Sequence, residues 1–298
     1  MTEPVSDGTA SRTVLVRMRD LLPELRPSER RVAERFVADP AGTAARTVAE
    51  LAAQCLTSTT TVVRFCRRMG YERYQDLRLD VTREITRERL ETANVPEVTG
   101  DIDRDDTMED IVAKVSHAET LSIADTASAL DLDALAQAVA AVGRARRVDV
   151  FGVGASAFVG LDVQQKLVRI GRTTLNWSDS HAAWTSAATL DAECVAIAVS
   201  HSGATADTIE FLDIARGAGA TTIALTNHGG SALAAVADIV LTTAARETAF
   251  RSGALGSRIA QLMVVDCLFI GVAQARYDES MAALRTTYSA VRRPRPSA

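Results

Sequence analysis

The second half of the chain alternates short β-rich runs with longer helical stretches, and this alternation limits the possible folds more than any other feature of the sequence. We expect four strands, at Arg147 to Phe151, Cys194 to Val199, Thr221 to Leu225 and Ile239 to Thr242. Helices are expected at Thr107 to Leu130, Asp131 to Val142, Gly256 to Ala275 and about Asp278 to Val291. Such alternation is typical of a parallel α/β sheet flanked by helices.

The first 90 residues or so predict a separate, all-helical domain. Apolar residues recur at helical spacing within Glu29 to Ala38, directly after a proline. Thr47 and Glu50 have the spacing of a capping box, which marks the start of another helix. Ser58 can cap the next helix, expected at Thr59 to Met69. Short helices at this spacing suit a helix-turn-helix, although any small helical bundle could show it.

A polar segment separates the two regions. It runs from Ala93 to Asp106 and contains Pro96, Gly100 and four aspartates, which suits a linker. We therefore expect a helical domain at 12–92, a linker at 93–106 and an α/β domain at 107–291.

Composition and charge narrow the function classes. The 298 residues suffice for two domains with cores of their own. Net charge is −5, yet residues 1–95 carry 16 arginines against 14 acidic residues, which is compatible with a small basic surface. The four cysteines lie far apart without a C-x-x-C pair, so we expect buried thiols and no metal site or disulfide. The polar start and the short apolar stretch Leu262 to Ala273 predict a cytoplasmic protein that does not cross a membrane.

The helix expected at 59–69 has two contrasting faces. Val62, Phe65 and Cys66 fall on one side, whereas Thr60, Arg64 and Arg67 fall on the other. A solvated basic face is the alternative, but Glu72 is the only acidic residue among four arginines from Ser58 to Arg73. Arginine and threonine can bind base edges and phosphates of DNA. The DNA-contacting residues we predict are Ser58, Thr59, Thr60, Arg64, Arg67, Arg68 and Arg73.

Two loops that follow predicted strands could hold a phosphate. The first, Phe151 to Ser156, has a G-x-G pattern that a tight turn would explain equally well, and Phe158 stands where a dinucleotide site needs a third glycine. The second, Ser200 to Thr205, places three hydroxyls and a glycine at a helix start. The residues predicted to bind are Gly154, Ala155, Ser156, Ser200, His201, Ser202, Gly203 and Thr205. No cofactor is expected.

At these residues the chain resembles a known family. The run T-V-V-R-F-C-R-R-M-G-Y at 61–71, with Y-Q-D-L-R at 74–78, looks like the N-terminal domain of RpiR-family regulators over about 14–90. The S-H-S-G-A-T loop resembles the phosphosugar signature S-x-S-G-x-T of SIS domains, and that likeness extends over about 108–280. Ala204 departs from relatives that often carry glutamate there. The resemblance implies a DNA-binding head, a flavodoxin-like SIS domain, and Glu247 and His181 as candidates to reach sugar hydroxyls, with surface roles as the alternative.

Several functions remain open at this point. The reading we favour is a non-enzymatic transcriptional regulator, with no catalytic residues, that binds operator DNA and a phosphorylated sugar as a homodimer or tetramer. The helix Gly256 to Ala275 is the expected dimer interface. An SIS-type sugar-phosphate isomerase is the first alternative, since Glu247 and a histidine could supply an acid and a base. The second alternative is a phosphosugar-binding module whose helical head docks on another protein.

Overall fold

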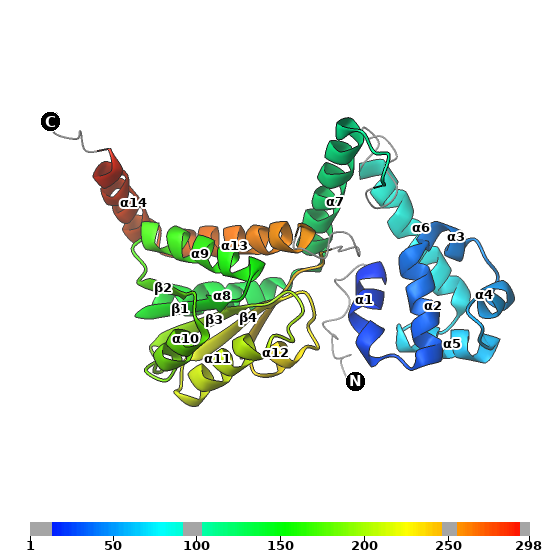
Figure 1. Ribbon diagram of the computed structural model, residues 1–298, viewed down its shortest axis with the longest axis horizontal. Coiled ribbons are helices and arrows are strands. Elements are labelled where there is room, and N and C mark those ends of the chain that lie inside the picture. Colours follow the sequence, from blue (N-terminus) through cyan, green and yellow to red (C-terminus); the bar gives the residue numbers. More distant parts are fainter. Residues whose placement is uncertain (1–13, 92–102, 246–254, 293–298) are drawn as a thin grey trace, which may run out of the picture. The chain divides into compact units, whose positions relative to one another are not determined.

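The computed structural model describes residues 14–91, 103–245 and 255–292. The chain divides into two compact units, residues 1–117 and 118–298, each with its own hydrophobic core. Figure 1 shows the helical unit in blue and cyan and the α/β unit in green to red. The two units are described in turn.

The described part of the N-terminal unit begins with seven helices, of which the 18-residue α6 is the longest. They are α1 (Val14–Leu21), the 3-10 helix η1 (Leu22–Glu24), α2 (Pro27–Ala38), α3 (Pro40–Ala44), α4 (Val48–Gln54), α5 (Thr59–Arg68) and α6 (Tyr74–Glu91). The capping box of Thr47 and Glu50 forms as expected, and Ser58 caps α5 by accepting a hydrogen bond from the Thr61 N–H. Phe36 and Phe65 stack in the core with their ring centroids 6.5 Å apart, which packs α2 against α5.

A side chain from α2 holds the turn between α4 and α5. Arg31 donates from Nε to the Cys55 carbonyl at 2.9 Å and from Nη2 to the Leu56 carbonyl at 3.0 Å. Leu56 has φ 49°, a left-handed conformation that few non-glycine residues adopt. The guanidinium therefore satisfies carbonyls that the end of α4 leaves free.

Two tyrosines tie α6 to the rest of this unit. The Tyr71 hydroxyl accepts from Arg17 at 2.7 Å and donates to Asp80 at 2.9 Å, while Tyr74 donates to the Arg46 carbonyl at 3.2 Å. Burial raises the pKa of both phenols from 10.0 to about 12. Both hydroxyls therefore stay neutral in the folded protein at pH values at which an exposed tyrosine ionises.

The described end of the predicted linker packs against α7 (Met108–Ala129). Lys114 of α7 lies 3.0 Å from the Asp103 carboxylate and 2.8 Å from that of Asp106. These two ion pairs fix residues 103–106 to the first turns of the helix.

The C-terminal unit is a five-stranded sheet between two layers of helices. After α7 the elements are α8 (Leu132–Arg144), β1 (Arg147–Gly152), α9 (Ala155–Arg169), β2 (Thr174–Trp177), α10 (Ser180–Ala187), β3 (Cys194–Val199), α11 (Ala206–Gly217), β4 (Thr221–Thr226), α12 (Ala232–Ala235), β5 (Ile239–Thr242), α13 (Gly256–Ala275) and α14 (Tyr277–Val291). The strand order is β2-β1-β3-β4-β5 and every pair is parallel. This is the flavodoxin-like order, as expected; the sequence reasoning missed β2.

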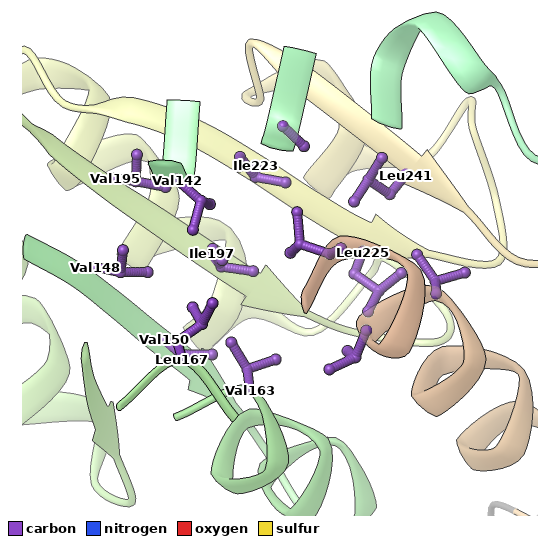
Figure 2. Packing of buried hydrophobic residues seen from close by; sticks show 14 of the residues in the cluster. Val142, Val148, Val150, Val163, Leu167, Val195, Ile197, Ile223, Leu225 and Leu241 are labelled. Carbon is purple, nitrogen blue, oxygen red and sulfur yellow. The ribbon is translucent and has the colours of Figure 1, made fainter. Parts of the chain in front are cut away.

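Side chains of different size cover the two faces of the sheet. On one face, branched residues such as Val195, Ile197 and Ile223 pack against α8, α9 and α13 (Figure 2). On the other face, Ala196 and Ala198 share a core with residues of α10, α11 and α12. Figure 1 shows α9 and α13 on one side of the sheet and α10 to α12 on the other. Because successive side chains of β3 point to opposite faces, the strand packs against the helices on both sides of the sheet.

Helix α13 contributes more to the core than the sequence suggested. At 20 residues it is long and apolar enough to cross a membrane by length and composition. Val264, Leu268 and Val272 are nevertheless buried in the core of the unit, as in the central helix of a globular domain. The apolar side of α13 therefore packs mainly against other elements of the same unit.

A buried carboxylate joins β1, β2 and α10. Asp149 has no exposed surface, and its oxygens accept hydrogen bonds from Arg147 at 2.6 Å, Trp177 Nε1 at 2.9 Å and Ser186 at 2.6 Å. Arg147 also donates to Ser186. A fully buried charge needs such a complete set of partners.

Candidate functional site

The two loops predicted to bind phosphate meet at one edge of the sheet. β1 and β3 are neighbours, and Gly152 at the end of β1 pairs with Val199 at the end of β3. The sheet continues from β1 to β2 on one side and from β3 to β4 on the other. Sheets of this order bind ligands outside the carboxyl ends of the strands at this reversal point. The structure therefore brings the first loop and the loop 200–205 together where a ligand is expected.

The first loop requires glycine and leads directly into α9. A Cβ at Gly152 would lie 2.8 Å from the Ser156 carbonyl oxygen, which is too close for any other residue. Gly154 has φ 61° and is the N-cap of α9, with no side chain capping the helix. Ala155 and the half-buried Ser156 form the first turn of α9. The Ser156 N–H donates to the Val153 carbonyl at 3.2 Å, so the Ala155 N–H is the one of the two that has no backbone partner among the described residues.

The second loop carries a network of hydroxyl groups. The hydroxyls of Ser200 and Thr205 lie 3.1 Å apart, and Ser200 also accepts from the Gly203 N–H at 3.2 Å. Ser202 is exposed and accepts from the Ala204 N–H at 3.2 Å. Thr205 is the N-cap of α11, yet its hydroxyl does not cap that helix. The hydroxyls of Ser200, Ser202 and Thr205 therefore lie beside the first N–H groups of α11.

The last residue of β4 and residues that follow it, none of which was predicted from the sequence, anchor this loop. Asn227 donates its N–H to the His201 carbonyl at 3.0 Å, and the Thr226 hydroxyl donates to the same carbonyl at 3.2 Å. Leu233 donates its N–H to the Gly203 carbonyl at 2.9 Å. A run of polar residues directly after a strand, at the edge that carries the hydroxyl loop, was the signal that could have found them.

Two histidine rings lie beside the loop. His201 and His228 meet edge to face with their centroids 5.8 Å apart, and both side chains are partly exposed. His181 instead lies on α10, where its ring meets Trp184 edge to face at 5.4 Å. Glu247 lies outside the described residues.

The chemistry of this edge suits an anion. Asp179 caps α10 and Ser231 caps α12, whereas α9 and α11 begin without a side-chain cap. A helix N-terminus carries a partial positive charge and unpaired N–H groups, so two such ends beside hydroxyl donors can hold a phosphate. Among the described residues, no three histidine, cysteine or acidic side chains cluster closely enough to hold a metal ion.

Helix α5 presents the predicted DNA-contacting residues on one exposed surface. Val62, Phe65 and Cys66 are buried, and burial raises the pKa of the Cys66 thiol to about 12. All seven residues predicted to contact DNA are exposed: Ser58 at the N-cap, Thr59, Thr60, Arg64, Arg67 and Arg68 on the helix, and Arg73 beyond it. The two faces expected from the sequence are thus present.

The arginines differ in their partners. Arg67 has no hydrogen-bond or ion-pair partner among the described residues. Arg68 donates to the Glu24 carbonyl at 3.2 Å and Arg73 donates to Asp76 at 3.3 Å. Arg64 pairs with the buried Glu29 at 2.6 Å, a partner 35 residues away that the helical wheel could not reveal.

Comparison with known proteins matches both units to described families. The model of the helix-turn-helix domain of the rpiR family matches residues 13–88, and that of the SIS domain matches residues 143–271. An HTH-type transcriptional regulator of Caldanaerobacter subterraneus subsp. tengcongensis is 35% identical over 92% of this chain and 95% of its own.

Solved structures give the same result. The Vibrio vulnificus NanR protein complexed with ManNAc-6P is 29% identical, covers 93% of this chain and 97% of its own, and superposes with a TM-score of 0.58. The sugar isomerase domain of an RpiR transcription factor from Sphaerobacter thermophilus is 27% identical, covers 60% of this chain and 98% of its own, and has a TM-score of 0.56.

Proposed function

Because the chain belongs to the RpiR family of helix-turn-helix transcriptional regulators and carries an SIS domain, we propose that a phosphorylated sugar bound in that domain modulates operator binding by α5. The observation that carries the proposal is the pair of helix N-termini without side-chain caps at the carboxyl ends of β1 and β3. The complex of NanR with ManNAc-6P supports the same class of ligand. Genes of carbohydrate metabolism are the targets we propose.

The effector contacts divide into two groups. The phosphate is bound by Ser156, Ser200, Ser202 and Thr205 with the N–H groups of both helix starts, because hydroxyl and amide donors together match its charge. His201 and Glu247 are the residues that we propose for the sugar hydroxyls.

The DNA contacts lie on the exposed face of α5. Ser58, Thr59 and Thr60 stand at its N-terminal end, where hydroxyls and N–H groups suit phosphates. Arg67 supplies a charge that has no partner in the described part of the chain. The DNA-binding domain is 12–92 and the effector domain 107–291 in this proposal, with 93–106 between them. Regulation of this kind places the protein in the cytoplasm.

In this proposal the SIS domain binds the sugar phosphate as a sensor and does not convert it to a product. The support is that a relative matching nearly the whole chain is named an HTH-type transcriptional regulator. Incubation with a panel of aldose and ketose phosphates tests this point, and formation of the other isomer would contradict it.

A homodimer is the assembly we propose, and an exposed apolar groove supports it. Phe158, Leu161 and Val168 of α9 are 64%, 49% and 46% exposed, and they line a groove with Tyr288 and Val291 of α14, which are 56% and 87% exposed. An apolar patch of this kind on one face suits a second copy of the chain. Since α13 packs mainly on its own chain, the dimer face that we propose lies on α9 and α14.

The experiment begins with a thermal-shift panel of sugar phosphates that includes ManNAc-6P. The hit is then titrated by calorimetry into wild type and into Ser202→Ala/Thr205→Ala. Each lost hydrogen bond to a charged group costs about 1.5–3 kcal/mol, so affinity should fall by tenfold or more. DNA affinity measured with and without the hit should differ.

A matched control separates the site from a general effect on the fold. Thr185 and Thr189 are exposed at α10, and each donates its hydroxyl only to its own turn. Thr185→Ala/Thr189→Ala should bind the sugar phosphate as wild type does. Equal affinity of wild type and Ser202→Ala/Thr205→Ala would show that the pocket is elsewhere.

A further inference from the structure

A buried carboxylate of α2 engages two arginines of α5. Glu29 is only 1% exposed, and its Oε1 accepts a hydrogen bond from Arg64 Nε at 2.6 Å. Arg68 Nη1 lies 3.7 Å from the second oxygen, Oε2. Arg64 and Arg68 are four residues apart, so they lie on the same side of α5, above the carboxylate.

Stability alone does not account for this arrangement. Replacing a buried ion pair by apolar residues of similar volume often leaves a protein as stable or more stable, because the charges lose their hydration. Val32 and Phe36 follow Glu29 at helical spacing and are buried in the same core as the inner side of α5, where Phe36 stacks on Phe65. An apolar residue at position 29 would extend that packed face, so stability gives no reason for a carboxylate there.

The ion pair leaves part of Arg64 available to a ligand. Glu29 binds Nε, whereas the two terminal amino groups have no partner among the described residues, and the side chain is 49% exposed. An arginine held at Nε presents its remaining donors as a planar fork. A fork of this kind matches the O6 and N7 acceptors of guanine in the major groove.

On the premise that α5 binds DNA, as proposed above, we infer that Glu29 is a positioning residue for sequence recognition. It fixes the Arg64 guanidinium so that the terminal amino groups meet a guanine edge. It also cancels the charge of Arg64, which reduces attraction to phosphates at random sequence. Arg67, with no acidic partner among the described residues, supplies general affinity instead.

Two opposite effects follow when the carboxylate becomes an amide. Glu29→Gln keeps the shape of the side chain and an oxygen acceptor but removes the charge. Arg64 then gains freedom and net charge, so discrimination between sequences should fall by at least about fivefold. Binding to unrelated DNA should become more salt-dependent, by close to one unit in the slope of log affinity against log salt.

The test uses a duplex enriched from a randomised library by the wild-type protein, together with a copy in which each guanine of the enriched motif is replaced. Fluorescence anisotropy at several salt concentrations gives both the discrimination ratio and the salt slope. Glu34→Gln is the matched control, because Glu34 is an exposed glutamate of the same helix. It should leave the discrimination ratio unchanged.

Other variants separate the outcomes. If Glu29→Gln does not fold, Arg64→Lys decides, because lysine keeps the charge pair but lacks the fork, and discrimination should still fall. If Glu29→Gln folds and keeps the wild-type discrimination ratio and salt slope, then the ion pair of Glu29 is only structural and the proposal is wrong. Unchanged DNA affinity in Arg67→Ala would instead contradict the proposed role of α5.

Discussion

Gly203→Ala should damage the effector loop through crowding as well as through backbone strain. Gly203 has φ 61°, and an added Cβ would collide with the side chain of Ser231 and lie 2.9 Å from the Thr226 hydroxyl oxygen. Gly219 provides the control, since its φ is 95° and the nearest heavy atom would lie 3.9 Å away. Gly219→Ala therefore has the unfavourable backbone conformation without the collision.

The magnitude follows from these two contributions. A left-handed conformation costs an L-residue about 1–2 kcal/mol, which both variants share. Forcing an extra carbon into a packed site adds about 1–3 kcal/mol, so Gly203→Ala should lower the free energy of unfolding by about 2–5 kcal/mol. The loop also holds Ser200 and Thr205, so we expect the sugar phosphate to lose affinity.

Urea unfolding of the two variants measures the difference, and a second-site change tests its cause. Ser231 caps α12 by accepting from the Ala234 N–H at 3.3 Å, and glycine at an N-cap costs only a few tenths of a kcal/mol. Gly203→Ala/Ser231→Gly should therefore recover most of the crowding contribution, because only the contact with the Thr226 hydroxyl remains. Equal unfolding free energies for Gly203→Ala and Gly219→Ala, or no recovery in the double variant, would refute this reasoning.

Two further predictions concern pH and assembly. Because the folded-state pKa of Tyr71 and Tyr74 is raised from 10.0 to about 12, their contribution to stability is complete below pH 10 and is lost as the pH rises toward 12. Circular dichroism and tyrosinate absorbance should show the helical unit unfolding in this window; ionisation of all tyrosines at pH 10 with the fold intact would contradict it. Phe158→Glu should yield monomers by light scattering, whereas Leu132→Glu, at an apolar residue that is 70% exposed outside the groove, should not; a dimeric Phe158→Glu would contradict the proposed interface.

Local patterns made much of the fold predictable. The strand Cys194–Val199 and the helix Gly256–Ala275 have the bounds expected from the sequence, because each is a mostly apolar run. Thr47 and Ser58 marked helix starts because capping depends on residues only three positions apart. β2 was missed, since its four residues are a short edge strand stabilised by pairing with β1.

The candidate site was predictable only where its residues are contiguous in the sequence. The hydroxyl loop at 200–205 could be found because its residues are contiguous. Asn227 and Ser231, which support it, come from another part of the chain and become neighbours only through the strand order. The pair of Glu29 and Arg64 is likewise visible only after α2 and α5 have packed.

The contact of Arg31 with the turn between α4 and α5 limits which segment of the DNA-binding domain can be exchanged between proteins. The carbonyls of the turn between these two helices accept hydrogen bonds from a guanidinium that belongs to α2. A peptide containing only α4 and α5 lacks it, so the carbonyls of Cys55 and Leu56 would have to find water instead. The smallest portable unit for exchanging DNA preference between regulators is therefore a segment that starts before α2, and chimaeras joined between α2 and α4 would inherit recognition residues without their geometry.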